Sequence, residues 1–269
     1  MLRDITFGQY YQAKSPIHSA DPRIKMILMI IFIVFIFLSS NMFALLFSFV
    51  SVALVMAVSK VPIKLYLKNM KAILPILIFT AIINLFYGDG STVLVEFWKL
   101  SITTEGVFKA IFMATRIMLL IFISSVLTYT TTPNDLTDAI ESLLSPLRFL
   151  GLKNAVHTLA MMMTIALRFI PTLIEEAEKI MNAQKARGAD LESGGIIERV
   201  KALIPILIPL LISSVRRAYE LAEAMECRCY NGGEGKTRMK QMKLKMLDLY
   251  LSVITVLMLL GVILINIII

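Results

Sequence analysis

Long apolar runs separated by short charged stretches make up most of the chain's hydrophobic pattern. A membrane-spanning α-helix needs about 20 mostly apolar residues, because no water inside the bilayer can satisfy its backbone groups. Only Ser39-Ser40-Asn41 interrupts the first two runs, which predicts a tight helical hairpin at that point. The pattern therefore predicts an all-α chain with about five transmembrane helices, over residues 24–42, 43–59, 72–88, 107–128 and 246–269.

Two further apolar stretches lie within a long polar interval and are harder to classify. The second of them, residues 202–215, is below the usual spanning length and contains two prolines. The first, residues 155–174, is long enough to span, but it contains His157 and Arg168 and continues directly into a glutamate-rich segment. We therefore predict that both stretches belong to amphipathic helices outside the bilayer.

The spacing of apolar residues defines these amphipathic helices more closely. Apolar positions recur at helical intervals from Met163 to Ile180, which indicates one long helix, kinked near Pro171. A shorter helix is predicted over residues 134–147, where leucines and an isoleucine share one side. Helices of this kind lie along a membrane surface or bury their apolar faces on one another.

A weak internal repeat relates two segments of this interval at a constant offset along the chain. Each copy has small residues at every third position and ends in an arginine followed by another small residue. Small residues let helices approach closely, so we expect the copies to cross and to present two arginine tips. The repeat aligns Ala177, Ile180, Ala183, Ala186 and Arg187 with Ala218, Leu221, Ala224, Cys227 and Arg228.

The two terminal arginines, Arg187 and Arg228, have two interpretations. A cation stabilises a helix C-terminus by about 0.3–1 kcal/mol, which is enough to explain either arginine taken alone. Two copies with small neighbours favour docking to acidic groups of a partner, since a guanidinium can hold a carboxylate through two hydrogen bonds. If both apolar stretches spanned the bilayer, the two tips would lie on opposite sides of it.

The positions of the lysines and arginines orient the chain. The composition is 58% hydrophobic with a net charge of +8, and the basic residues flank the apolar runs, which favours membrane edges over nucleic acid as the source of the charge. They cluster before the first run and after the second, so these segments should be cytoplasmic, whereas residues 39–42 and 88–106 should be external. We therefore divide the chain into a four-span bundle (1–128), a cytoplasmic region (129–245) and a final span (246–269) that leaves the C-terminus external.

The sequence predicts no cofactor, metal or catalytic site. Cys227 and Cys229 are too close for an ordinary disulfide and lack histidine partners for zinc, so we expect reduced thiols. His18 and His157 are far apart and belong to no metal-binding motif. An enzyme is therefore disfavoured.

The glycine-rich segment 232–237 is only loosely similar to a phosphate-binding loop. Tyr230 stands where the motif requires its first glycine, and no strand precedes it. We interpret the segment as a polar turn and expect ATP to bind to another polypeptide.

Arg116 lies within the fourth apolar run, where an ionisable residue suggests a function. A polar seam of the bundle, or contact with a partner, explains it equally well. A self-sufficient secondary transporter or channel is the main alternative function, and it would show related halves built from spans. Here the repeat lies in the polar interval instead.

Three motifs occur in order along nearly the whole chain, and the second and third carry the arginine tips of the repeat. The motifs are Phe7 to Tyr10 with Ser15 to His18 and Asp21 to Lys25, then Ala166 to Pro171 with Ala183 to Gly188, and then Ala224 to Tyr230. Together they resemble the transmembrane T-component of energy-coupling factor transporters, the EcfT family. In the third motif, cysteines replace the small Ala and Gly that are common beside the arginine in that family.

The resemblance implies a non-catalytic coupling subunit with long cytoplasmic coupling helices in the cell membrane. Two ABC-type, EcfA-like ATPase subunits would dock on the arginine tips, and a substrate-binding S-component for vitamins or micronutrients would pack in the membrane. The expected docking residues are Ala186, Arg187, Gly188, Cys227, Arg228 and Cys229. The expected helix-crossing residues are Pro171, Ala177, Ala183, Ala218 and Ala224.

Overall fold

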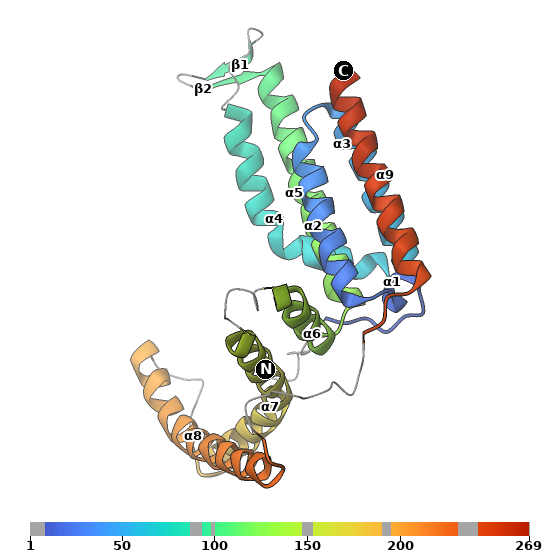
Figure 1. Cartoon of the computed structure of the whole chain (residues 1–269). Coiled ribbons are helices and arrows are strands. Elements are labelled where there is room, and N and C mark those ends of the chain that lie inside the picture. Colours follow the sequence, from blue (N-terminus) through green and yellow to red (C-terminus); the bar gives the residue numbers. More distant parts are fainter. Residues whose placement is uncertain are drawn as a thin grey trace. The chain divides into compact units, whose positions relative to one another are not determined.

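The structure, a computed structural model, describes residues 9–86, 93–97, 100–146, 153–189, 195–230 and 242–268 (Figure 1). It confirms a polytopic helical protein. The chain divides into two compact units, one containing residues 8–136 and 241–269 and the other containing residues 137–240. We call the first unit the bundle and the second the coupling unit.

The described part of the bundle contains one short helix and five long ones, which are seen side by side in Figure 1. The hairpin predicted at Ser39–Asn41 is confirmed, because one helix ends and the next begins around these residues. The helices are α1 (Pro16–Ser19), α2 (Pro22–Leu38), α3 (Met42–Ser59), α4 (Ile63–Phe86), α5 (Thr104–Thr130) and α9 (Met246–Ile268).

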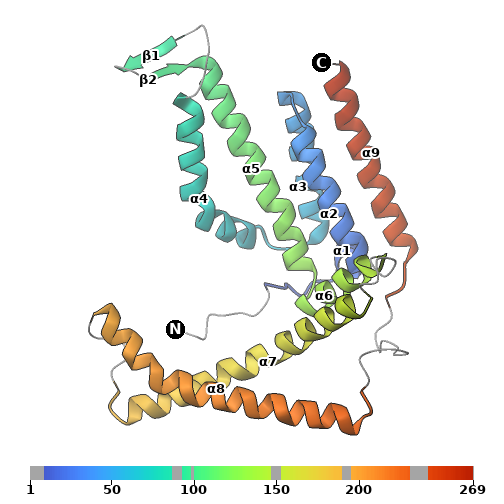
Figure 2. The ribbon, with the colours of Figure 1, turned by 60° about the vertical axis from the view of Figure 1, so that its left-hand side comes forward.

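Two segments of the bundle differ from the sequence expectation. α4 begins at Ile63, well before the predicted start, because lysines that we assigned to a loop occupy its first turns. Figure 2 shows α4 changing direction along its length, and Pro75 lies inside the helix, where it removes a backbone hydrogen bond. The expected external loop contains a short antiparallel hairpin, β1 (Val93–Phe97) and β2 (Leu100–Thr103), with Phe97 paired to Leu100.

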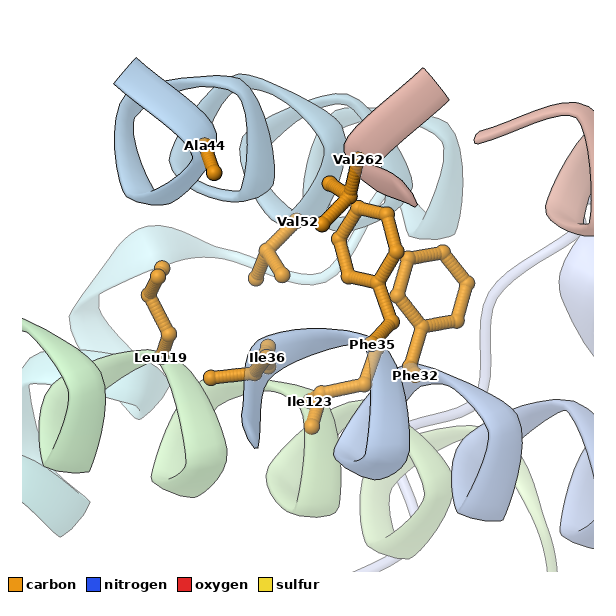
Figure 3. Close-up of a cluster of buried hydrophobic side chains, with 8 residues drawn as sticks. All are labelled: Phe32, Phe35, Ile36, Ala44, Val52, Leu119, Ile123 and Val262. Atoms are coloured by element: carbon orange, nitrogen blue, oxygen red, sulfur yellow. The ribbon is translucent and has the colours of Figure 1, made fainter. Parts of the chain in front are cut away.

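The core of the bundle is an apolar cluster contributed by α2, α3, α5 and α9 (Figure 3). Two aromatic rings of α2, Phe32 and Phe35, pack edge to face at a centroid distance of 5.6 Å. Ser39 and Ser48 add a short hydrogen bond of 2.8 Å between their hydroxyl groups, the kind of polar contact that joins helices in a membrane. The buried cluster consists of Phe32, Phe35, Ile36, Ala44, Val52, Leu119, Ile123 and Val262.

Side-chain hydrogen bonds show which helix ends meet in the bundle. The end of α9 joins the turn after α2, because Asn266 Nδ2 donates to the Leu38 carbonyl at 2.6 Å. At the opposite end, the Asp21 amide donates to Asp248 Oδ1 at 2.8 Å, and Lys25 Nζ donates to the Thr130 carbonyl at 2.9 Å. The end of α5 and the start of α9 therefore lie at the same end of the bundle.

The coupling unit is built around two very long helices, α7 (Lys153–Ala186) and α8 (Ile196–Cys227). Both continue through internal prolines, and α7 is an unbroken α-helix across Pro171. The helix before them, α6 (Pro133–Leu143), ends earlier than the sequence predicted.

Six helices among the described residues are long and apolar enough to cross a membrane, namely α3, α4, α5, α7, α8 and α9. α2 has 17 residues, the lower limit for a span, and all but its first turn is apolar. α7 and α8 have a lower mean hydropathy than the other four helices. Length and composition do not separate a span from an amphipathic helix, so the placement of α7 and α8 outside the bilayer stays a prediction.

Candidate functional site

α7 and α8 pack against each other in opposite directions, as Figure 2 shows. Gln184, near the end of α7, donates to the carbonyl of Pro205 in the first half of α8 at 3.4 Å. Tyr230, just after α8, donates its hydroxyl to Met161 Sδ near the start of α7 at 2.7 Å. The two ends of this helix pair therefore carry different arginines.

An ion pair lies between these two contacts. Arg217 Nη2 of α8 lies 3.1 Å from Glu176 Oε2 of α7, and both side chains are partly exposed. The two residues occupy equivalent positions of the internal repeat. The helices therefore cross where the two copies of the repeat face each other.

The chain after α7 reverses in a Schellman motif. Gly188 adopts a left-handed conformation with φ of 85°. Its amide donates to the Lys185 carbonyl at 3.0 Å, and the Ala189 amide donates to the Gln184 carbonyl at 3.0 Å. Arg187 is the last residue before this reversal, and we call residues 186–188 the Arg187 tip.

α8 ends in the same motif at the equivalent positions. Cys229 is left-handed with φ of 55°. Its amide donates to the Glu226 carbonyl at 2.8 Å, and the Tyr230 amide donates to the Met225 carbonyl at 3.0 Å. Residues 227–229 form the Arg228 tip. Cysteine here adopts a conformation that glycine adopts without cost, so the two tips share a backbone shape and differ in strain.

The side chains of both tips are available to a partner. Arg187 and Arg228 are exposed, and within the described ranges neither guanidinium has a hydrogen bond or ion pair. Backbone amides already satisfy carbonyls in the last turn of each helix, so neither arginine is needed to cap them. Cys227 and Cys229 are exposed free thiols.

The predicted helix-crossing residues are spread over the pair rather than gathered at one contact. Ala177 is half-buried on α7, and Ala224 lines a hollow between the two helices. Pro171, Ala183 and Ala218 are exposed. Larger side chains form the hydrogen bonds and the ion pair described above, and a crossing role for the small residues stays a prediction.

Most of the length of α7 separates the two tips. Met161, near the start of α7, lies beside the end of α8, whereas the Arg187 tip lies at the far end of α7. A helix rises by about 1.5 Å per residue, so the tips are roughly 40 Å apart along the axis of α7. The two tips are therefore separate surfaces of the helix pair.

A buried polar cluster in the bundle was not predicted from sequence. Asp248, only 3% exposed, accepts hydrogen bonds from the backbone amides of Asp21 at 2.8 Å and Lys245 at 2.7 Å. Lys25, 8% exposed, donates to the His18 carbonyl at 3.2 Å as well as to Thr130. These contacts attach the N-terminal motif to α5 and α9, and no local pattern indicates contacts across so many residues.

His18 connects parts of the N-terminal motif through both of its ring nitrogens. Its Nε2 lies 2.8 Å from the Tyr11 carbonyl, which can only accept, so Nε2 carries the hydrogen. Its Nδ1 lies 2.7 Å from the Ser15 hydroxyl and accepts from it when the ring is neutral. Burial lowers the pKa of His18, which favours this neutral form.

Arg116 is part of a polar seam within the bundle. Its guanidinium donates to the carbonyl of Ser39, in the turn after α2, and lies over the Phe112 ring at 4.6 Å from the centroid. These contacts agree with the structural interpretation of Arg116. A role in transport is not needed to explain its position.

The other sequence candidates for chemistry remain isolated. His157 Nδ1 lies 3.1 Å from Glu141 Oε1, which is a pair and not a ligand cluster. Among the described residues, no three His, Cys, Asp or Glu side chains are grouped so that they could hold a metal ion. The glycine-rich segment 232–237 lies outside the described residues.

Comparison with known proteins now identifies the family. The model of the CbiQ family, described as cobalt transport protein, matches residues 13–239. The energy-coupling factor transporter transmembrane protein EcfT of Ruminiclostridium cellulolyticum is 53% identical over 264 residues, which cover 98% of each chain. The protein of that name from Clostridium kluyveri is 49% identical over 253 residues, covering 94% of this chain and 93% of the relative. The chain therefore belongs to the EcfT family of energy-coupling factor transporter transmembrane proteins.

Proposed function

We propose that this chain couples ATP hydrolysis in two separate ATPase subunits to a substrate-binding S-component in the membrane. Family membership makes it the transmembrane T-component of a transporter, a multi-pass membrane protein with no catalytic role of its own. One ABC-type ATPase subunit docks on the Arg187 tip and the other on the Arg228 tip. The S-component, which selects the vitamin or micronutrient, packs in the membrane.

The observation that carries this proposal is the pair of exposed arginines, without partners in the described ranges, at opposite ends of α7 and α8. Both arginines precede the same backbone reversal, so both are presented in the same way. A guanidinium on a rigid helix end can hold a partner's carboxylate through two hydrogen bonds. When the two ATPase subunits move relative to each other, the tips move with them, and the long helices carry that motion to the S-component.

The bundle supports a cytoplasmic position for the coupling unit. α5 ends and α9 begins at the same end of the bundle, so the intervening residues leave and return on one side of the membrane. Lysines and arginines flank this end, which is therefore the cytoplasmic one. Together with the predicted placement of α7 and α8 outside the bilayer, this orientation makes the N-terminus and residues 129–245 cytoplasmic and the C-terminus external.

Substitution of both tips tests the docking proposal. The double variant R187Q/R228Q should retain its place in the membrane but lose ATPase subunits during co-purification and lose substrate uptake in whole cells. R216Q is the matched control, because Arg216 is an exposed arginine of α8 outside both tips. Normal co-purification and uptake of R187Q/R228Q would show that the arginines only stabilise helix ends.

Thiol labelling tests the topology separately. The native Cys227 and Cys229 report on the Arg228 tip, and R187C in a C227S/C229G background reports on the other tip. A membrane-impermeant maleimide should reach neither tip in intact cells and both in inverted vesicles. Labelling of either tip from outside intact cells would contradict a cytoplasmic coupling unit.

A further inference from the structure

A hollow between α7 and α8 opens beside the Arg228 tip, with a volume of about 390 Å³. Two arginines line it, Arg168 from the middle of α7 and Arg228 from the end of α8. The rest of its lining is apolar and consists of Ile165, Phe169, Leu221, Ala224 and Met225. The hollow thus combines two cations with an apolar wall, and none of the described residues that line it is acidic.

The two cations have no countercharge in the described part of the chain. Arg168 and Arg228 each lack a hydrogen bond and an ion pair there, although Arg217 on the same helix pair is matched with Glu176. Two like charges on one hollow repel each other, and an anion placed between them would be held by both. The hollow is therefore complementary to an acidic group that the described part of the chain does not supply.

The other end of the helix pair lacks the second cation. The internal repeat aligns Arg187 with Arg228. Because α7 and α8 run antiparallel, the end of α7 lies beside the first half of α8, just as the end of α8 lies beside the first half of α7. The position that corresponds to Arg168 is then Pro209, which carries no charge and no donor. The two docking ends share one arginine and one backbone motif but differ in this residue.

We propose that the ATPase subunit at the Arg228 tip inserts an acidic side chain with an apolar neighbour into the hollow, between Arg168 and Arg228. The inference rests on the proposed function, which supplies the ATPase as the partner. It adds Arg168 as a docking residue. It also makes the end at Arg228 the tighter of the two and the more sensitive to the charge of the partner.

An ATPase side chain fits the hollow better than a phospholipid headgroup does. Arg228 belongs to a tip whose backbone repeats that of the Arg187 tip, which ties the hollow to the docking surface. Apolar side chains from both helices form the wall of the hollow. This wall can pack against the apolar residue that neighbours the acidic side chain of the ATPase. The lipid alternative remains an outcome of the test.

The test uses the full chain in nanodiscs made only of phosphatidylcholine and the ATPase subunits that co-purify with it. An R187Q background removes the other docking end, so titration with these subunits reports on the Arg228 tip alone. Adding R168Q should weaken binding about tenfold or more, as expected for a charge-assisted hydrogen bond. Adding R216Q should leave binding within about twofold, because an exposed arginine away from the hollow has no such partner.

Different failures have different meanings. If the wild-type chain retains no ATPase, the proposed function itself fails. If R228Q weakens binding but R168Q matches R216Q, docking stands and the hollow is not part of it. If R168Q reduces binding only in nanodiscs that contain phosphatidylglycerol, and bound phosphatidylglycerol is lost with it, the hollow is a lipid site and the inference is wrong.

Discussion

Two buried charged residues of the bundle and three exposed arginines of the coupling unit differ in whether they have partners within the chain. In the bundle, Asp248 and Lys25 are nearly fully buried, and each has hydrogen-bond partners in the same unit. In the coupling unit, Arg187, Arg228 and Arg168 have none among the described residues. A buried polar group without a partner is costly, so the bundle's contacts serve folding, whereas the exposed arginines can stay hydrated without a partner in the chain.

Removal of the Asp248 carboxylate should have the largest effect on folding. D248A leaves the amides of Asp21 and Lys245 without acceptors, which should lower the free energy of unfolding by about 3 kcal/mol. Unfolding by sodium dodecyl sulfate, followed by circular dichroism, measures this. D248N keeps one acceptor oxygen and should lose about half as much. A negligible loss in D248A would mean that water replaces the carboxylate.

A methyl group at Gly106 should also destabilise the bundle. An added Cβ would lie 2.6 Å from the Leu85 carbonyl oxygen and 3.2 Å from Thr103 Oγ1, and the backbone oxygen cannot move aside easily. G106A should therefore lower stability by about 1–3 kcal/mol in the same assay. G261A is the control, because its Cβ would meet only the edge of the Phe47 ring, at 3.2 Å and 3.3 Å. Equal losses in the two variants would contradict a close approach of α4 and α5 at Gly106.

The two tips should respond in opposite directions to changes at the left-handed residue. G188A places a side chain at a φ of 85° and should destabilise the last turn of α7 by about 1 kcal/mol. C229G removes such a side chain and should stabilise the last turn of α8 by about the same amount. Hydrogen–deuterium exchange of the peptides at each tip measures both. Faster exchange in C229G would show that the cysteine adds a contact of its own.

The ion pair between α7 and α8 should contribute least. Glu176 and Arg217 are each partly exposed, with 26% and 35% of their side-chain surface accessible, so solvent screens their attraction. A double-mutant cycle with E176Q and R217Q should give a coupling below about 1 kcal/mol. A coupling well above that value would mean that the crossing of the helix pair depends on this contact.

Sequence reasoning succeeded where the signal is periodic or repeated along the chain. Apolar runs located the long helices of the bundle, and the internal repeat located both tips, although not their shared left-handed reversal. Sequence reasoning missed contacts that depend on how distant segments of the chain are oriented relative to each other. The hydrogen bond between Asp21 and Asp248 joins residues at opposite ends of the sequence, and Arg168 and Arg228 line one hollow only because α7 and α8 run antiparallel. The predicted start of α4 was too late because a helix can begin with charged turns before it becomes apolar, as the lysines of α4 show.

Because α5 finishes and α9 starts at the same end of the bundle, residues 137–240 form an insertion between two helices that are both hydrogen-bonded to the short segment 21–25. A chain in which a short flexible linker replaces residues 137–240 would keep the hydrogen bonds of Asp248 and Lys25 described above. Hybrid proteins that exchange residues 137–240 between relatives should therefore still fold their bundles.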